Sequence, residues 1–386
     1  MKNPSRASLY LGTLTVMAVA LALKHLSSFL LPLVIAILIT FATMPIISFL
    51  QKKKVPYLLV VIIILLITVV LFALVAFLLY NSLNTLIRNF PRYFVRLQVV
   101  GGQLQAWMET RFNISLSSYF SNYDWFRTIQ SMVLSVSGSF LVFIQALGLV
   151  FLFLIFFLIE SPRLEKTIRV AFPHETGIRI IRLYAGMIRD IGMYLGLKLV
   201  ISLATGLSVY LALLLIGMDF PLMWGLLAVI LNFIPSLGSF FVMAATIIMG
   251  ILQFYPDGIK IFLVAFSMIG IQVIWGNFID PRLSGDRLKL SPLIILISLF
   301  VWGWIWGIAG MFLAVPLLSV MKLIMGNVPR LVPLTILMEN PGKAVPKSRR
   351  SRRPGGGAAP PNEASPNERP PGETPADETP PGEGPD

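Results

Sequence analysis

The chain has 386 residues, of which 56% are hydrophobic and 13% are charged, and its mean hydropathy is +0.82. Soluble domains carry about 25% charged residues, so the composition excludes an ordinary soluble protein and indicates a polytopic membrane protein. Cysteine is absent, which excludes disulfides and thiolate metal ligands. The sequence also lacks a metal-ligand cluster, a phosphate-binding loop and a nucleophile–base motif. We therefore expect no cofactor, no metal and no enzymatic activity.

The net charge of +13 does not indicate nucleic-acid binding, because the basic residues collect in short segments between apolar runs. This distribution is typical of cytoplasmic loops, which carry an excess of Lys and Arg. The expected environment is therefore the lipid bilayer, with a multi-pass chain whose N- and C-termini are both cytoplasmic.

Residues 1–80 are predicted to form an N-terminal part with three spans. The three apolar runs are Leu9–Leu23, Phe29–Leu50 and Tyr57–Tyr80. Runs of roughly 20 apolar residues cross a hydrocarbon core of ~30 Å. The alternative interpretation of the first run is a cleaved secretory peptide. A second apolar run follows after only a few residues, which favours an uncleaved helical hairpin.

Residues 81–136 are polar and aromatic, and we expect an extracytoplasmic section of amphipathic helices there. Apolar side chains recur at helical spacing, and Arg88, Arg92 and Arg96 lie on the other side of the helix. Such a section packs on the membrane surface or on a neighbouring subunit. The second of these arrangements predicts a homo-oligomer.

The fourth and fifth predicted spans are Gly138–Ile159 and Tyr194–Ile216, joined by a basic cytoplasmic segment. We expect the fourth span to end before Pro162 and the later half of the joining segment to form an interfacial helix. Residues 342–386 are rich in Pro, Gly and Glu and are predicted to be a disordered cytoplasmic tail. Its basic first part is suited to anionic lipid headgroups or to a protein partner.

Two long apolar runs, residues 220–252 and 291–325, are each too long for one span and too short for two. The flanking charges place both ends of each run on one side of the membrane, so each is predicted to be a hairpin of two half-helices. The bends are expected at Ile234–Gly238 and at Trp302–Gly310. Each hairpin follows one full span, in opposite orientations, which is the inverted-repeat design of many secondary transporters.

The predicted fold is therefore an all-α polytopic membrane protein with five to six full spans and two opposed re-entrant or broken helical hairpins. It has eight apparent transmembrane segments, and residues 137–330 form its transport part. Non-helical backbone at membrane depth is tolerated only when it is buried in protein or lines a water-filled cavity. Two opposed bends thus predict a shared polar site near the midplane. The alternative is two long, kinked helices without a site.

Three stretches carry a recognisable pattern: "NFIPSLGSF" (Asn232–Phe240), "GNFIDPRLSGDRLKLSPL" (Gly276–Leu293) and "GIAGMFLAVPL" (Gly307–Leu317). They resemble signature sequences of the AI-2E family of bacterial inner-membrane transporters. The resemblance extends over about residues 9–328. It implies a location in the bacterial cytoplasmic membrane and either a substrate exporter or a sodium(lithium)/proton antiporter, and it fixes no coupling residue.

The first bend supplies the main substrate candidates. Asn232 can donate and accept hydrogen bonds at depth, and an unsatisfied amide there would cost several kcal/mol. It either binds substrate or closes the hairpin through backbone groups freed by Pro235, and Ser236 and Ser239 share these alternatives. Glycine allows tight packing and bending, and this is the expected role of three positions: Gly238, Gly307 and Gly310.

Four further polar residues are candidates for the translocation path or for ion coupling. An ionisable group at membrane depth is functional by default, so Asp280 and Asp219 are ion-coupling candidates, and Asn277 accompanies Asp280. We expect Asp280 to form a loop salt bridge with Arg282 or a neighbouring base, and Asp219 to cap the start of the first hairpin. Lys198 either extends to the cytoplasmic interface or faces substrate.

The predicted function is secondary transport, in which a small polar organic solute is exported. The resemblance suggests a signalling molecule such as autoinducer-2. Buried carboxylates are scarce, which favours a neutral or anionic solute over the sodium(lithium)/proton antiport alternative. A passive channel and a non-transporting scaffold are the further alternatives.

Overall fold

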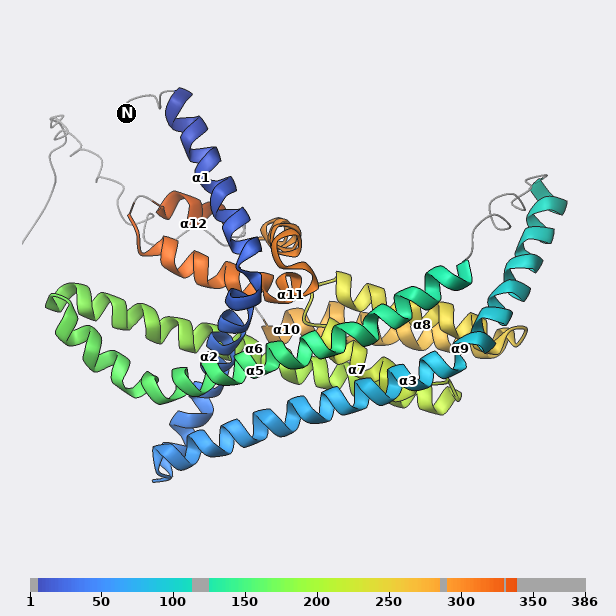
Figure 1. The fold of residues 1–386 in the computed structure, drawn as a ribbon, viewed down its shortest axis with the longest axis horizontal. Coiled ribbons are helices and arrows are strands. Elements are labelled where there is room, and N and C mark those ends of the chain that lie inside the picture. Colours follow the sequence, from blue (N-terminus) through green and yellow to red (C-terminus); the bar gives the residue numbers. More distant parts are fainter. Residues whose placement is uncertain (1–5, 113–124, 285–289, 330, 339–386) are drawn as a thin grey trace, which may run out of the picture. The chain divides into compact units, whose positions relative to one another are not determined.

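The computed structural model describes residues 6–112, 125–284, 290–329 and 331–338. All regular secondary structure in these ranges is helical, which confirms the all-α prediction (Figure 1). The predicted tail, residues 342–386, lies outside the described residues. The helices are α1 (Arg6–His25), α2 (Ser27–Lys52), α3 (Tyr57–Phe112), α5 (Trp125–Ala171), α6 (His174–Ile216), α7 (Pro221–Leu231), α8 (Leu237–Phe254), α9 (Gly258–Ile271), the π-helical η1 (Gln272–Ile279), α10 (Asp280–Ser284), α11 (Pro292–Gly326) and α12 (Val332–Met338).

Seven of the described helices are long and apolar enough to cross a membrane, as judged by length and composition. Two shorter apolar helices, Tyr10–His25 and Pro221–Leu231, accompany them. Together these helices establish a multi-pass membrane protein. They cover the predicted spans and both predicted hairpin runs.

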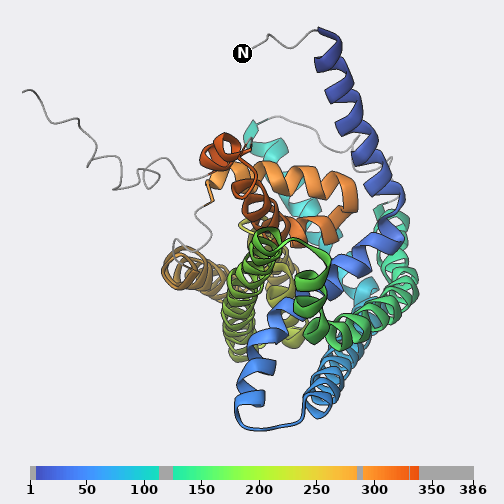
Figure 2. The same ribbon diagram turned by 90° about the vertical axis from the view of Figure 1, so that its left-hand side faces the viewer.

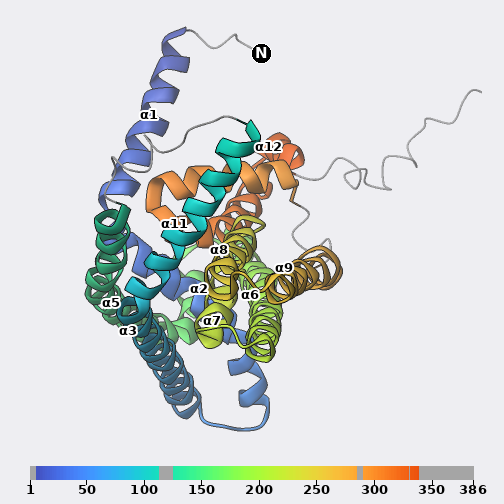
Figure 3. The same cartoon turned by 90° about the vertical axis from the view of Figure 1, so that its right-hand side faces the viewer.

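Several helices are longer than the sequence predicts. Helix α3 is continuous through Pro91, so the third span does not end at Tyr80 (Figure 3). Helix α5 likewise continues through Pro162 to Ala171, and the predicted interfacial helix is the first part of α6. No strong turn signal accompanies these changes from apolar to amphipathic sequence. Adding a residue to an existing helix is easier than starting a new one, so the helices extend.

The N-terminal helices pack against α5. Val60, Val61 and Ile64 of α3 share one buried cluster with Leu154 and Leu158 of α5, and α2 contributes to the same cluster. The Tyr57 hydroxyl donates to the main-chain carbonyl of Leu158. Helix α6 contacts α2, α5, α7, α9 and α11, so it connects the N-terminal helices with the two hairpins. Figure 2 shows α11 and α12, in orange to red, running beside each other.

Helices α6 and α7 approach each other through two glycines. A Cβ atom built on Gly206 would lie 2.6 Å from the Gly225 carbonyl oxygen, and one on Gly225 would lie 2.8 Å from the Gly206 carbonyl oxygen. Small residues at helix interfaces in membranes allow such backbone contact. Any side chain at either position would push the two helices apart.

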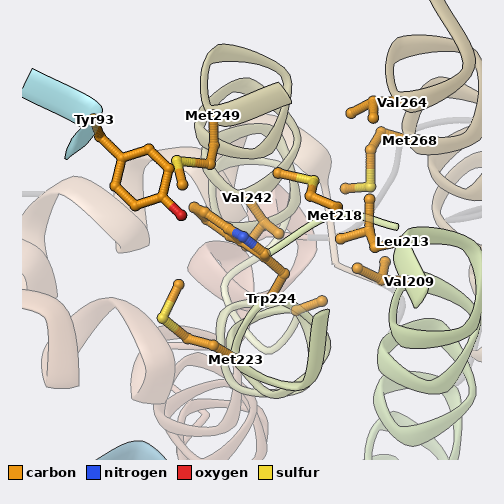
Figure 4. Packing of buried hydrophobic residues seen from close by; sticks show 11 residues of the cluster. Tyr93, Val209, Leu213, Met218, Met223, Trp224, Val242, Met249, Val264 and Met268 are labelled. Carbon is orange, nitrogen blue, oxygen red and sulfur yellow. The ribbon is translucent and has the colours of Figure 1, made fainter. Parts of the chain in front are cut away.

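A methionine-rich core joins α6, α7, α8 and α9, with Tyr93 of α3 at its edge (Figure 4). Trp224 lies among Met218, Met223 and Met249, and its indole nitrogen is buried without a hydrogen-bond partner in the described part of the chain. Methionine side chains adapt to irregular spaces. This core therefore fills the space between the first hairpin and its neighbours.

Candidate functional site

The first apolar run folds back on itself between α7 and α8. The Leu237 N–H donates to the Pro235 carbonyl at 2.6 Å, and Ser236 between them has φ 59° and ψ −48°. This is a γ-turn of the positive-φ type, which is rare and strained. A Cβ on Gly238 would lie only 1.7 Å from the Leu231 carbonyl oxygen. Glycine at position 238 is therefore required for α7 and α8 to meet.

The second apolar run folds back in the same way within α11. Its helical backbone is broken at Trp306 and at Gly307, which has φ 63° and ψ −144°. The Ser298 hydroxyl donates to the Ala314 carbonyl at 3.1 Å, and a Cβ on Gly310 would lie 1.9 Å from the Trp302 carbonyl oxygen. The two arms of α11 are thus in contact, as the hairpin interpretation expects and a single kinked helix would not allow.

The two hairpins contact each other, but not tip to tip. The rings of Phe233 and Phe312 stack at 4.6 Å between centroids, and Ile234 packs against Leu299 and Ala314 on the two arms of α11. The bend of α11 instead faces the end of α1, where Trp306 Nε1 donates to the Leu23 carbonyl at 3.0 Å.

Asn232 lies at the centre of a buried polar contact between three helices. Its Nδ2 donates to Ser202 Oγ of α6 at 3.0 Å, and its Oδ1 accepts from Ser239 Oγ of α8 at 3.1 Å. Asn232 is 6% exposed and Ser202 is fully buried. The amide therefore closes the hairpin through side chains rather than through backbone freed by Pro235. An Asn amide has two donors and two acceptor lone pairs, so the capacity for a further hydrogen bond remains.

One helical turn from Ser202, Lys198 forms an ion pair with Asp280. The distance from Lys198 Nζ to Asp280 Oδ2 is 2.7 Å, and the side chains are 6% and 24% exposed. Among the described residues, Lys198 is the only charged one that is buried. Its ammonium group is therefore enclosed by protein and paired with a carboxylate. The Arg282 guanidinium, which was expected to pair with Asp280, lies 3.7 Å from the centre of the Phe278 ring.

Asp280 directly follows the π-helical segment η1. Trp275 of this segment donates from Nε1 to Ser208 Oγ of α6 at 3.1 Å. Isolated π-helical turns occur frequently at functional sites. Helix α6 thus presents Lys198, Ser202 and Ser208 in succession to polar groups of η1, α10 and the first hairpin. We define this set of contacts as the α6 polar stripe.

Four predicted site residues lie away from the stripe. Asp219 accepts a hydrogen bond from the Tyr93 hydroxyl at 2.5 Å, and its backbone N–H donates to Gln253 Oε1 at 2.7 Å. It does not cap α7, because Phe220 precedes that helix in a left-handed conformation. Asn277 is exposed on η1. Gly307 and Gly310 shape the α11 hairpin and do not reach the stripe through any hydrogen bond.

Sequence reasoning missed Ser202, Ser208, Trp275 and Tyr93. The spacing of Ser202 from Lys198, four residues along an apolar helix, could have identified the first, because such residues share one face. Among the described residues no group of three or more His, Cys, Asp or Glu side chains could hold a metal ion.

Comparison with known proteins gives consistent matches. A sequence profile described as AI-2E family transporter matches residues 11–330. A provisionally named transport protein of Borreliella burgdorferi is 31% identical over 307 residues, which cover 80% of this chain and 83% of that protein. A similarly named protein of Haemophilus influenzae is 30% identical over a region that covers 83% of this chain and 92% of that protein. The AI-2 transport protein TqsA of Escherichia coli is 27% identical over the same two fractions, 83% and 92%.

Proposed function

Because the chain belongs to the AI-2E family of transporters, we propose that it exports a small polar organic solute across the bacterial inner membrane. The observation that carries this proposal is the α6 polar stripe. It places an amide, three hydroxyls and an ion pair inside an apolar helical protein. Ionisable residues within membrane proteins are costly and mark substrate or ion pathways.

The charge of the stripe favours a neutral solute. Lys198 is compensated by Asp280, so a solute with a net charge would add an uncompensated charge to a low-dielectric site, which is costly. The Asn232 amide and the Ser202 and Ser239 hydroxyls are suited to hydroxyl and carbonyl groups. The name of the Escherichia coli relative makes AI-2 the first solute to test.

The arrangement in the membrane completes the proposal. We place the basic segments and both termini in the cytoplasm, following the excess of Lys and Arg there. The part containing both hairpins, residues 137–330, carries the solute. Residues 1–80, with the predicted extracytoplasmic section 81–136, hold the protein in place and supply the contacts of a homo-oligomer.

Flux into inverted membrane vesicles tests the proposal. Vesicles containing the wild-type chain should accumulate AI-2 or another neutral polyhydroxy solute with saturable kinetics. Asn232→Leu should reduce this flux at least tenfold, because the hydrogen bonds to Ser202 and Ser239 are lost. Asn277→Leu is the matched control, since that amide is exposed outside the stripe, and it should transport normally.

The other outcomes identify the alternatives. Flux without saturation would indicate a passive channel, and proton release driven by a sodium gradient in the absence of solute would indicate an antiporter. No flux for any of a panel of neutral and charged solutes would contradict transport and favour a scaffold. Equal flux through Asn232→Leu and Asn277→Leu would remove the stripe from the transport path.

A further inference from the structure

Helix α3 extends well beyond its membrane-spanning portion. By composition the span is Tyr57–Asn89, and we call the remainder, residues 90–112, the α3 arm. Its side chains at 93, 96 and 103 are spaced so that they fall on one side of the helix, at about 100° per residue. All three contact one end of the first hairpin, at the loop before α7, the last turn of α8 and Tyr255.

Tyr93 binds the loop between α6 and α7. Its hydroxyl donates to Asp219 Oδ2 at 2.5 Å, and its ring contacts Phe220 edge to face at 6.1 Å between centroids. Burial, and then the hydrogen bond to Asp219, raise the pKa of the Tyr93 hydroxyl, so it remains a donor at every physiological pH. Phe220 has φ 58°, which is unusual for a bulky residue. Tyr93 therefore contacts the loop at the residue whose backbone conformation is unusual.

Arg96 binds the end of α8. Its guanidinium donates to the Leu252 carbonyl at 3.3 Å and also to the Gln253 carbonyl. The last carbonyls of a helix have no partner within it and carry a partial negative charge, so a cation is well suited to this end. Farther along the arm, Gln103 and Tyr255 are joined by a hydrogen bond from the Tyr255 hydroxyl.

Gln253, in the last turn of α8, joins the two parts of the hairpin that the arm contacts. Its Nε2 donates to the Gly217 carbonyl at 3.0 Å, and its Oε1 accepts from the Asp219 N–H at 2.7 Å. The loop before α7 and the end of α8 are therefore one connected unit. The arm holds this unit from the same side through Tyr93, Arg96 and Gln103.

We infer that the α3 arm is a clamp that fixes this end of the α7–α8 hairpin to the N-terminal helices and must release whenever the hairpin moves. Its hydrogen bonds go to Asp219, to the last carbonyls of α8 and to Tyr255, and water can replace them when the arm separates. Net losses are small for hydrogen bonds exchanged with water, so the clamp is reversible. The inference rests on the proposed function only for the second part, the release during transport.

Cross-linking tests the release. The naturally cysteine-free chain allows the double variant Arg96→Cys/Gln253→Cys to be treated with a short bifunctional thiosulfonate. We expect efficient cross-linking, an at least tenfold loss of AI-2 flux in vesicles, and recovery after reduction. The two single-cysteine variants and the pair Tyr57→Cys/Leu158→Cys, within the N-terminal helices, should keep their flux after the same treatment. Cross-linked protein that transports normally would overturn the clamp, as would failure to cross-link at these and adjacent positions.

A second measurement does not depend on transport. Tyr93→Phe keeps the ring but removes the hydrogen bond to Asp219, so hydrogen exchange at residues 217–220 and 253–257 should accelerate roughly tenfold in nanodiscs, as expected for one charge-assisted hydrogen bond. Tyr80→Phe, on the same helix before the arm, is the control. Unchanged exchange would refute the clamp. Accelerated exchange in a protein without flux for any solute would retain the clamp and refute the proposed transport.

Discussion

Removing one partner of the ion pair between Lys198 and Asp280 should destabilise the protein, and the two removals should differ. At the observed 2.7 Å, two unit charges attract by about 6 kcal/mol at an effective dielectric constant of ~20. The desolvation of both groups offsets much of this attraction. Loss of one partner from a buried pair nevertheless costs about 3–5 kcal/mol, because the remaining charge is left uncompensated.

The difference follows from exposure. Asp280→Asn leaves the ammonium of Lys198, which is 6% exposed, without a compensating negative charge, whereas Lys198→Met leaves a carboxylate that is 24% exposed and within reach of water. We therefore expect the destabilisation by Asp280→Asn to lie near the upper limit of that range, about 5 kcal/mol. The destabilisation by Lys198→Met should lie near or below the lower limit of about 3 kcal/mol. At roughly 2 °C per kcal/mol for a chain of this size, the melting temperature in detergent should fall by about 10 °C for the first.

The double variant Lys198→Met/Asp280→Leu separates stability from transport. Replacement of a whole buried ion pair by apolar residues is often neutral or stabilising, so its melting temperature should return close to that of the wild type. Its solute flux should remain low if the pair belongs to the transport path. Thermal unfolding followed by size-exclusion chromatography measures the first quantity. Single variants that each shift the melting temperature by less than 2 °C would refute the assignment of a buried, mutually compensating pair.

Three other substitutions test the hairpin geometry by thermal unfolding. Gly310→Ala should cost about 3 kcal/mol, because its Cβ would lie 1.9 Å from the Trp302 carbonyl oxygen, and a neutral result would mean that the arms of α11 are farther apart. Ser236→Gly should stabilise the protein by about 0.5–1 kcal/mol, since glycine adopts positive φ without strain, and destabilisation would contradict the γ-turn. Ser298→Ala should lower the free energy of unfolding by about 1 kcal/mol. Ser319→Ala should lower it less, because that hydroxyl bonds only within its own helix turn. Equal effects would contradict the contact across the hairpin.

Both bends could be predicted from sequence for a physical reason. Pro235 and Gly238 interrupt an apolar run at its centre, and so do the glycines after Trp302, while flanking charges indicate that each run returns to its starting side. Proline lacks an N–H and glycine accepts close approach, so these residues give a local signal of a turn. The continuation of α3 past Tyr80 could not be predicted in this way. A single proline, Pro91, without an adjoining turn residue does not determine where a helix ends.

The partners of the charged residues could not be predicted, since they depend on how distant helices pack. Asp280 has Arg282 as a neighbour in sequence, yet it pairs with Lys198, which is 82 residues away. Asp219 was expected to cap a helix two residues later and instead binds Tyr93, 126 residues away. Local sequence predicts which groups need a partner, and only the packing of α3, α6 and α10 determines which partner they obtain.

The close approach of Gly206 and Gly225 has a consequence for how the protein varies among its relatives. A methyl group at 206 would meet not only the Gly225 carbonyl but also a Val229 methyl, at 2.3 Å. A larger residue at one of these three positions therefore requires a smaller residue or a wider helix separation at the others. Substitutions at positions 206, 225 and 229 should consequently be correlated in evolution, and α6 and α7 should be inherited as a matched pair rather than exchanged separately between family members.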